Sequence, residues 1–200
     1  NYSTQNLIVV WGVVGIPSQN ADWKYVEKTN GSIELINYLG DLADVSVPSS
    51  IDGKTVTEIN AGCFKNNTAI KTIYIPIDVT TISTPSGYSS SPFYGCDRSL
   101  TIYCGASSKP SGWSGYWNYC DSYFQLPTLW DMLNSPEQNS NWSYAEKTSG
   151  GIMMIKYLGS ATIVEVPSSI DGKAVTEINM GCFNNNKSIT QVTIPNTVKS

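Results

Sequence analysis

The amino-acid sequence predicts a β-rich solenoid in which short parallel strands stack coil on coil. Three observations lead to this fold class: a long internal repeat, a shorter repeat inside it, and the absence of long amphipathic helical patterns. Strands of three or four residues bury little surface alone, so they need copies of themselves as neighbours. A chain of 200 residues can bury a sizeable core in this way.

The long repeat has an offset of 119 residues. Residues 23–64 and 142–183 align without a gap, and the match extends backward to Leu7 and Leu126. We therefore expect a complete repeat unit over 1–119 and a second, truncated unit over 120–200. Their expected parts are a cap or linker (1–22), coils that end in an aromatic cap (23–119), a linker or cap (120–141) and further coils (142–200).

A shorter period of 28 or 29 residues lies inside each unit. Its mark is an apolar-x-apolar-Pro string at residues 45–48 and 73–76, which returns without the proline at 102–104. Alternation gives each string an inward and an outward face. Proline ends the strand because it lacks the N–H that a sheet uses. We expect these strings to lie side by side over one shared interior.

Phenylalanines at positions 64, 93 and 183 recur between the short strands, and we expect their rings in the core. Asn67, Cys96 and Asn186 each follow three residues later. One interpretation is an internal ladder that satisfies the bending backbone. The other is an exposed loop asparagine, since this residue favours turns.

Hairpins and loops complete the expected pattern. Asp52-Gly53 between extended segments predicts a type I′ hairpin, and a second hairpin is expected over 23–38 around Thr29-Asn30-Gly31. The stretch 83–92 is rich in Ser, Gly and Pro, which predicts a flexible surface loop. A short helical turn is expected near 130–133.

Composition excludes several classes of function. The chain has no histidine, which removes the Ser-His-Asp triad and every zinc site that uses histidine. Its formal net charge of −4 argues against a groove for nucleic acid. The apolar run over 7–16 is too short for a bilayer, which needs about 20 residues, so we expect a buried strand or turn there.

The five cysteines do not form a thiol redox or zinc pattern, because no two stand at C-x-x-C spacing. Cys63 and Cys182 lie in Gly-Cys-Phe strings, which suits small buried side chains. Cys104 and Cys120 are candidates for a disulfide that spacing alone does not establish. We expect no cofactor and no bound metal.

The string V-P-S-S-I-D-G-K-x-V-T-E-I-N-x-G-C-F over 47–64, followed by I-P-x-x-V, closely resembles the BspA-like leucine-rich repeat family. The resemblance covers residues 23–119 and 142–200, and 99–113 looks like the segment that often ends such arrays in secreted bacterial proteins. It implies a right-handed leucine-rich-repeat solenoid with a parallel sheet along one face. It also implies a bacterial cell-surface or secreted protein that binds other macromolecules, often in adhesion. One departure is Asn-x-Gly-Cys-Phe where the family has Gly-x-x-Ala-Phe.

The first candidate binding residues are Ser46, Tyr74 and Tyr103. They are the middle residues of consecutive short strands, so alternation points them outward. Tyr74 and Tyr103 would then form an aromatic strip. Such a strip either contacts a partner or stabilises the sheet by packing across strands.

The second candidate binding residues are Trp113, Tyr116 and Trp117, which stand among Gly, Ser and Asn near Tyr119. Exposed rings on a loop could stack against a sugar or a protein. Alternatively, they form a cap over the last coil of the first unit, as solenoids require.

These observations predict a non-catalytic module that is secreted or displayed on the cell surface, with its signal peptide already removed. We expect it to mediate adhesion or protein–protein recognition, with a protein or glycan on a host or neighbouring cell as its partner. The alternative is a carbohydrate-binding module of a larger secreted protein. Nucleic-acid binding and membrane insertion are not expected. The open edge of the last coil predicts either edge-mediated self-association or a longer natural chain.

A hydrolase is the third interpretation, because glycoside hydrolysis needs only two carboxylates. Glu27, Asp52 and Glu58 are suitable residue types, but each recurs 119 residues later. A repeated scaffold role explains this duplication better than two active sites do.

Overall fold

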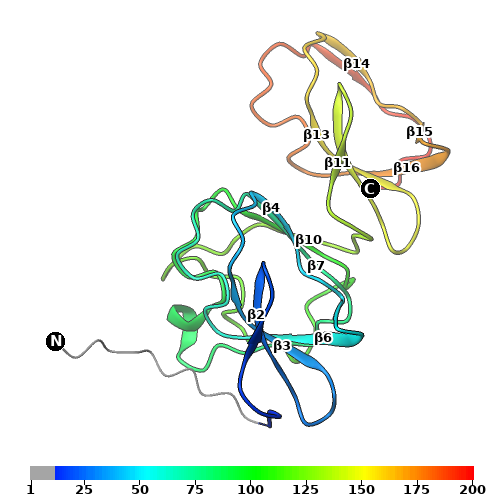
Figure 1. Ribbon diagram of the computed structural model, residues 1–200. Coiled ribbons are helices and arrows are strands. Elements are labelled where there is room, and N and C mark those ends of the chain that lie inside the picture. Colours follow the sequence, from blue (N-terminus) through cyan, green and yellow to red (C-terminus); the bar gives the residue numbers. More distant parts are fainter. Residues whose placement is uncertain (1–11) are drawn as a thin grey trace.

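The protein is a β-solenoid of about six turns, arranged as two successive solenoids (Figure 1). A computed structural model describes residues 12–200. We call residues 12–130 the first solenoid and residues 131–200 the second solenoid. The strands of the first solenoid are β1 (Ser18–Gln19), β2 (Trp23–Glu27), β3 (Ile33–Tyr38), β4 (Asp44–Ser46), β5 (Ser50–Ile51), β6 (Lys54–Ile59), β7 (Thr72–Ile75), β8 (Thr81–Ile82), β9 (Thr101–Cys104) and β10 (Thr128–Trp130).

The second solenoid repeats this plan over fewer coils. Its strands are β11 (Glu137–Gln138), β12 (Trp142–Glu146), β13 (Ile152–Tyr157), β14 (Ile163–Glu165), β15 (Ser169–Ile170), β16 (Lys173–Ile178) and β17 (Gln191–Thr193). One short 3-10 helix, Gly87–Ser90, is the single helix among residues 12–200. None of the described residues form a helix with the length and apolar character that crossing a bilayer takes.

The short strands form one parallel sheet in the order β10-β9-β7-β4. Val45 pairs with Ile73, and Ile73 with Ile102, so the predicted side-by-side stacking is confirmed. The inward residues of β4, β7 and β9 have almost no exposed surface and belong to one core, against which the half-buried Trp130 of β10 packs. The sheet also includes β10, which lies in the stretch expected as a linker or cap between the units.

A second parallel sheet, which was not expected from the sequence, lines another face of the coils. It runs β3-β6-β8, and its registers pair Ile33 with Val56 and Glu58 with Thr81. The resemblance implied a parallel sheet along one face, but the structure has parallel sheets along two. The second sheet arises because each coil contains two extended stretches, and both pair with the neighbouring coil.

The predicted hairpins are confirmed. β2 pairs antiparallel with β3 and covers its outer edge. β1 pairs in turn with β2. Asp52 and Gly53 have φ angles of 52° and 75°, the two positive values that a type I′ turn needs. The corresponding turn of the second solenoid has the same geometry at Asp171 and Gly172.

Aromatic rings fill the core where the sequence predicted them. Phe64 stacks on Phe93 with ring centroids 5.3 Å apart and planes 3° from parallel. Both rings are buried, and Phe183 packs against the core of the second solenoid. Such ring pairs stabilise a core by about 0.5–1.5 kcal/mol beyond their buried area.

Two local expectations were wrong, and the candidate disulfide is not formed. Within the apolar run 7–16, residues 7–11 lie outside the described residues, while Val14 and Ile16 are 56% and 87% exposed rather than buried. The stretch 130–133 has no helical turn, because Asp131 has a φ angle of 68° in the left-handed region. Cys104 and Cys120 are free thiols, as are the other three cysteines.

The stretch 83–92, expected as a flexible loop, carries the 3-10 helix and is anchored to the core. Ser91 is fully buried, and its hydroxyl donates a hydrogen bond of 3.0 Å to the carbonyl oxygen of Trp117. This anchor fixes the position of the tyrosines that lie nearby.

Candidate functional site

The outward residues of the parallel sheet form a ladder of Ser46, Tyr74, Tyr103 and Leu129. Tyr74 lies beside Tyr103, and Tyr103 beside Leu129, so the predicted neighbourhood of the two tyrosines is confirmed. These side chains point out of the coils as predicted, but the strip is not accessible along its whole length, because Tyr103 is covered and only 5% exposed. Burial raises the pKa of its phenol to about 12.

The second solenoid covers this ladder. Met132, Ala145 and Met153 form one apolar cluster with Tyr103, against which Tyr74 also packs. These residues come from the start of the second solenoid and from β12 and β13. The sequence alone did not show that part of the same chain covers the strip.

Hydrogen bonds extend this interface between the solenoids. The Tyr74 hydroxyl donates to the carbonyl oxygen of Leu133 at 2.8 Å. The hydroxyl oxygens of Ser46 and Ser135 lie 2.9 Å apart. Two of the three residues predicted as a partner-binding set therefore hydrogen-bond to the segment between β10 and β11.

Asp131 anchors the passage from one solenoid to the next. Its backbone N–H donates to Ala106 of the first solenoid at 2.8 Å, and its carbonyl oxygen accepts from the N–H of Thr148 at 2.9 Å. Its carboxylate accepts from the hydroxyls of Thr148 and Ser149 and lies 3.6 Å from the ammonium of Lys147. Burial alone would raise the pKa of this carboxyl, but these partners outweigh it and lower the pKa.

Trp113 and Trp117 form a cap rather than an exposed site. They are 2% and 3% exposed, their ring centroids lie 4.5 Å apart, and each lies 5.8 Å from the ring of Trp130. The indole N–H of Trp113 donates to the carbonyl oxygen of Val79 at 3.0 Å. Both tryptophans are buried, so the exposed-ring alternative is wrong for them, and their packing agrees with the cap interpretation.

Tyr116 remains accessible, with 45% of its surface exposed, and joins a group that we call the tyrosine surface: Tyr88, Tyr94, Tyr116 and Tyr119. The centroid of Tyr88 lies 6.4 Å from that of Tyr94 and 6.3 Å from that of Tyr116, and Tyr116 lies 5.4 Å from Tyr119. The ammonium of Lys65 lies 5.4 Å from the centre of the Tyr94 ring. Sequence reasoning missed Tyr88 and Tyr94, although the tyrosine in the inserted stretch 83–92 was a signal for them.

The carboxylates considered for hydrolysis take part in structural pairs. Glu27 pairs with Lys54, Glu58 with Lys28, and Asp52 accepts a hydrogen bond of 2.9 Å from Tyr25. Glu146 and Glu177 of the second solenoid make the corresponding pairs with Lys173 and Lys147. Among residues 12–200, no three His, Cys, Asp or Glu side chains come together as metal ligands.

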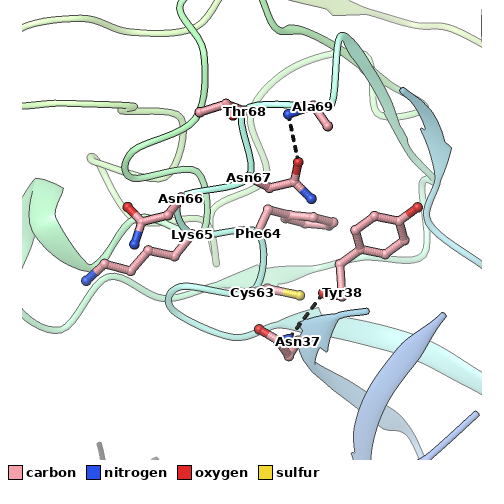
Figure 2. A pocket seen from close by; sticks show the side chains of 9 residues that line it. All are labelled: Asn37, Tyr38, Cys63, Phe64, Lys65, Asn66, Asn67, Thr68 and Ala69. Carbon is pink, nitrogen blue, oxygen red and sulfur yellow. Dashed lines mark hydrogen bonds between the residues drawn. The ribbon is translucent and has the colours of Figure 1, made fainter. Parts of the chain in front are cut away.

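A hollow of about 400 Å³ lies beside the Cys63–Phe64 turn. Figure 2 shows the side chains that line it. The side-chain oxygen of Asn67 accepts from the N–H of Ala69 at 3.0 Å and from that of Ile70 at 3.2 Å. Asn186 makes the same bonds in the second solenoid, whereas the thiol of Cys96 donates to the carbonyl oxygen of Phe64. Asn67 and Asn186 are therefore partly exposed turn asparagines, as the alternative interpretation had it, and of the three positions only Cys96 bonds to a neighbouring coil through its side chain.

Comparisons with known proteins agree with this architecture. The family described as "BspA type Leucine rich repeat region" matches six times, over residues 38–105 and 160–200, which is more than half of the chain. No curated protein matches the chain.

Two solved structures are similar to it. One is a leucine rich cell surface protein from Faecalibacterium prausnitzii, with 13% identity over 92% of this chain and 72% of that one, at a TM-score of 0.36. The other is a leucine rich repeat protein from T. pallidum, with 19% identity over 88% of this chain and 70% of that one, at a TM-score of 0.32.

Proposed function

The chain belongs to the BspA-type leucine-rich-repeat family, and from this premise we propose a non-catalytic binding module of a bacterial cell-surface or secreted protein. Its role is adhesion or protein–protein recognition. The tyrosine surface is the observation that carries this proposal. The partner is a protein or glycan on a host or neighbouring cell.

The tyrosine surface suits recognition because its rings are accessible while their positions are fixed. Tyr88 and Tyr116 are 40% and 45% exposed, yet each contacts another ring of the group. Tyrosine offers a large contact area with only two rotatable side-chain bonds, so little conformational entropy is lost on binding. The phenol hydroxyls add donors and acceptors at the rim of such a contact.

The fixed carboxylates support a non-catalytic role. Lys54 holds Glu27, and Lys28 holds Glu58, in pairs that recur in the second solenoid. A repeated pair of this kind stabilises neighbouring coils. Trp113 and Trp117 are buried and so are not available to stack on a sugar. Of the three rings considered for the carbohydrate-binding alternative, Tyr116 is the accessible one.

The test uses the full chain, carrying a fluorescent label, against host-cell surface proteins and a glycan array. We expect protein binding that falls by about tenfold or more in the Tyr88→Ser/Tyr116→Ser variant, because aromatic anchors dominate interface energy. The matched control is Tyr123→Ser, since Tyr123 is 92% exposed and stands outside the tyrosine surface. Unchanged binding by the double variant would refute the proposal, and selective glycan binding would establish the alternative.

Self-association stays a prediction. β17 pairs with β14 on one side, and sedimentation over a range of protein concentrations measures whether copies associate.

A further inference from the structure

The segment between β10 and β11 crosses the outer face of the parallel sheet and leaves a cleft on either side. The larger cleft has a volume of about 610 Å³, and the smaller about 240 Å³. Both are lined by Ser135, Pro136 and Glu137, so one stretch of chain separates them. Each cleft exists only because the second solenoid lies against the first.

The larger cleft has an apolar wall that the protein core leaves accessible. Ile77, from the turn after β7, is 59% exposed, and Leu133, from the segment between β10 and β11, is 48% exposed. Pro76 and Pro136 also line the cleft. Large aliphatic side chains that line a hollow can bury the apolar part of a ligand.

The polar lining of the two clefts is rich in acceptors and negative charge. Asp44, Asp78 and Glu137 contribute carboxylates, and no lysine or arginine lines either cleft.

From this lining we propose that the paired clefts bind an extended segment of a partner protein in which lysine or arginine stands next to an aliphatic residue. The cation lies beside Asp78 and Glu137 in the larger cleft, and the aliphatic side chain lies against Ile77 and Leu133. Arginine suits the position best, because its guanidinium offers five N–H donors in a fixed fork that matches carboxylate geometry. This site is separate from the tyrosine surface and does not depend on it.

The test measures binding of a short fluorescein-labelled peptide of arginine, leucine and glycine to the full chain by anisotropy. Two further peptides replace either the arginines by glutamate or the leucines by serine. We expect the first peptide to bind, and each replacement to weaken binding by about tenfold or more, since both charge and apolar contact contribute.

Variants of the protein separate a built cleft from general electrostatic attraction. The Asp78→Asn/Glu137→Gln variant should lose about tenfold in affinity. The matched control, Asp22→Asn/Asp41→Asn, removes the same charge from exposed positions outside both clefts and should bind normally. Ile77→Ser, an exposed position, should also weaken binding without a change in the unfolding temperature.

Three binding results would overturn the proposal: no binding of the arginine–leucine peptide, equal binding of the glutamate peptide, or an equal loss of affinity in the control variant. A fourth result would come from NMR of the full chain, if the peptide changed backbone amide chemical shifts only outside the clefts. The Tyr88→Ser/Tyr116→Ser variant distinguishes the two sites. It should keep peptide binding even where it abolishes adhesion, so either proposal can fail alone.

Discussion

The two solenoids have the same arrangement of core side chains, but they differ on the outer face of their first hairpin. In the first solenoid, Trp23 lies 4.9 Å from Tyr38 and 5.8 Å from Phe64, measured between ring centroids. The corresponding distances around Trp142 in the second solenoid are 4.8 and 6.0 Å. The core geometry is therefore repeated to within a few tenths of an ångström, while the outer face is free to change.

The outer face changes at one exchange of charge. Glu34 of β3 is 5% exposed and pairs with Lys28, whereas Met153 takes its place in β13 and packs with Tyr103. Lys147, the counterpart of Lys28, takes Asp131 as an additional partner. The acidic group has thus moved from the hairpin face to the segment before it, so the lysine keeps two acidic partners and the face becomes apolar. This exchange is what lets the second solenoid dock on the tyrosine ladder.

The largest expected effect tests whether the equivalent cores are equally strong. Phe64→Ala should lower the free energy of unfolding by about 3–5 kcal/mol, because it leaves a cavity against Phe93. Phe183→Ala should cost only about 2 kcal/mol, since the Phe183 ring is half-buried and its cavity opens to water. Urea titration followed by tryptophan fluorescence measures both losses. Equal losses would show that the stacking of Phe64 on Phe93 adds nothing to the free energy of unfolding.

The second prediction reverses the charge exchange. Met153→Glu restores the residue type of the first solenoid and should weaken the docking of the two solenoids by about 2–3 kcal/mol, because it buries a carboxylate beside Tyr103. Small-angle scattering should show a larger radius of gyration. The control Met180→Glu makes the same change at a fully exposed side chain and should alter neither measurement. A compact Met153→Glu variant would contradict the docking role of Met153.

The sequence predicted those parts of the fold that depend on local rules repeated many times. The Val-x-Val-Pro strings, the Asp-Gly turns and the Phe positions each obey one rule, so the first sheet, the hairpins and the core rings could be expected. The second parallel sheet was missed because Val56-Thr57-x-Ile59 forms a strand only when β3 and β8 supply its partners.

The candidate site was predicted less well, because its exposure depends on contacts between coils far apart in sequence. Tyr74 and Tyr103 lie side by side as expected, yet the second solenoid buries Tyr103. The tyrosine surface joins residue 88 to residue 116 through the anchored stretch 83–92. No pattern in one strand or loop contains that information.

The third prediction concerns Asp131, for which the first solenoid has Gly12. Asp131→Asn should lower the free energy of unfolding at neutral pH by about 1 kcal/mol, since it weakens the bonds to Thr148 and Ser149. Asparagine tolerates the left-handed backbone, so strain does not enter the comparison. Thermal unfolding measures the loss. The control variant Asp41→Asn removes an exposed carboxylate, so the difference between the two variants gives the effect of the anchor.

The pH dependence of this anchor has a definite sign. The folded-state pKa of Asp131 lies below its ordinary value of 3.8, so its contribution is complete above that value and is lost as the pH falls through the folded-state pKa. The difference between wild type and Asp131→Asn should therefore shrink on going from neutral pH to about pH 3. A difference that stays constant would mean that the carboxylate charge does not contribute.

The smallest expected effect concerns the reactivity of Cys63 and Cys182, which occupy equivalent positions in the two solenoids. Burial raises the pKa of the Cys182 thiol to about 11, and it raises the pKa of Cys63 further, with the charge of Glu34 adding to the rise. At a given pH the thiolate fraction of Cys63 is thus lower, and iodoacetamide should label Cys182 faster by about tenfold or more. Mass spectrometry of timed samples measures both rates, and equal rates in urea control for intrinsic reactivity.

Glu34→Met makes this last comparison specific, because it gives the first solenoid the residue of the second. Without the nearby carboxylate, the pKa of Cys63 should fall and its labelling should accelerate towards that of Cys182. Lys28 keeps Glu58 as its partner, so the coil pair survives the change. If labelling of Cys63 does not change, burial alone protects the thiol, and the charge exchange acts only on the outer face of the hairpin.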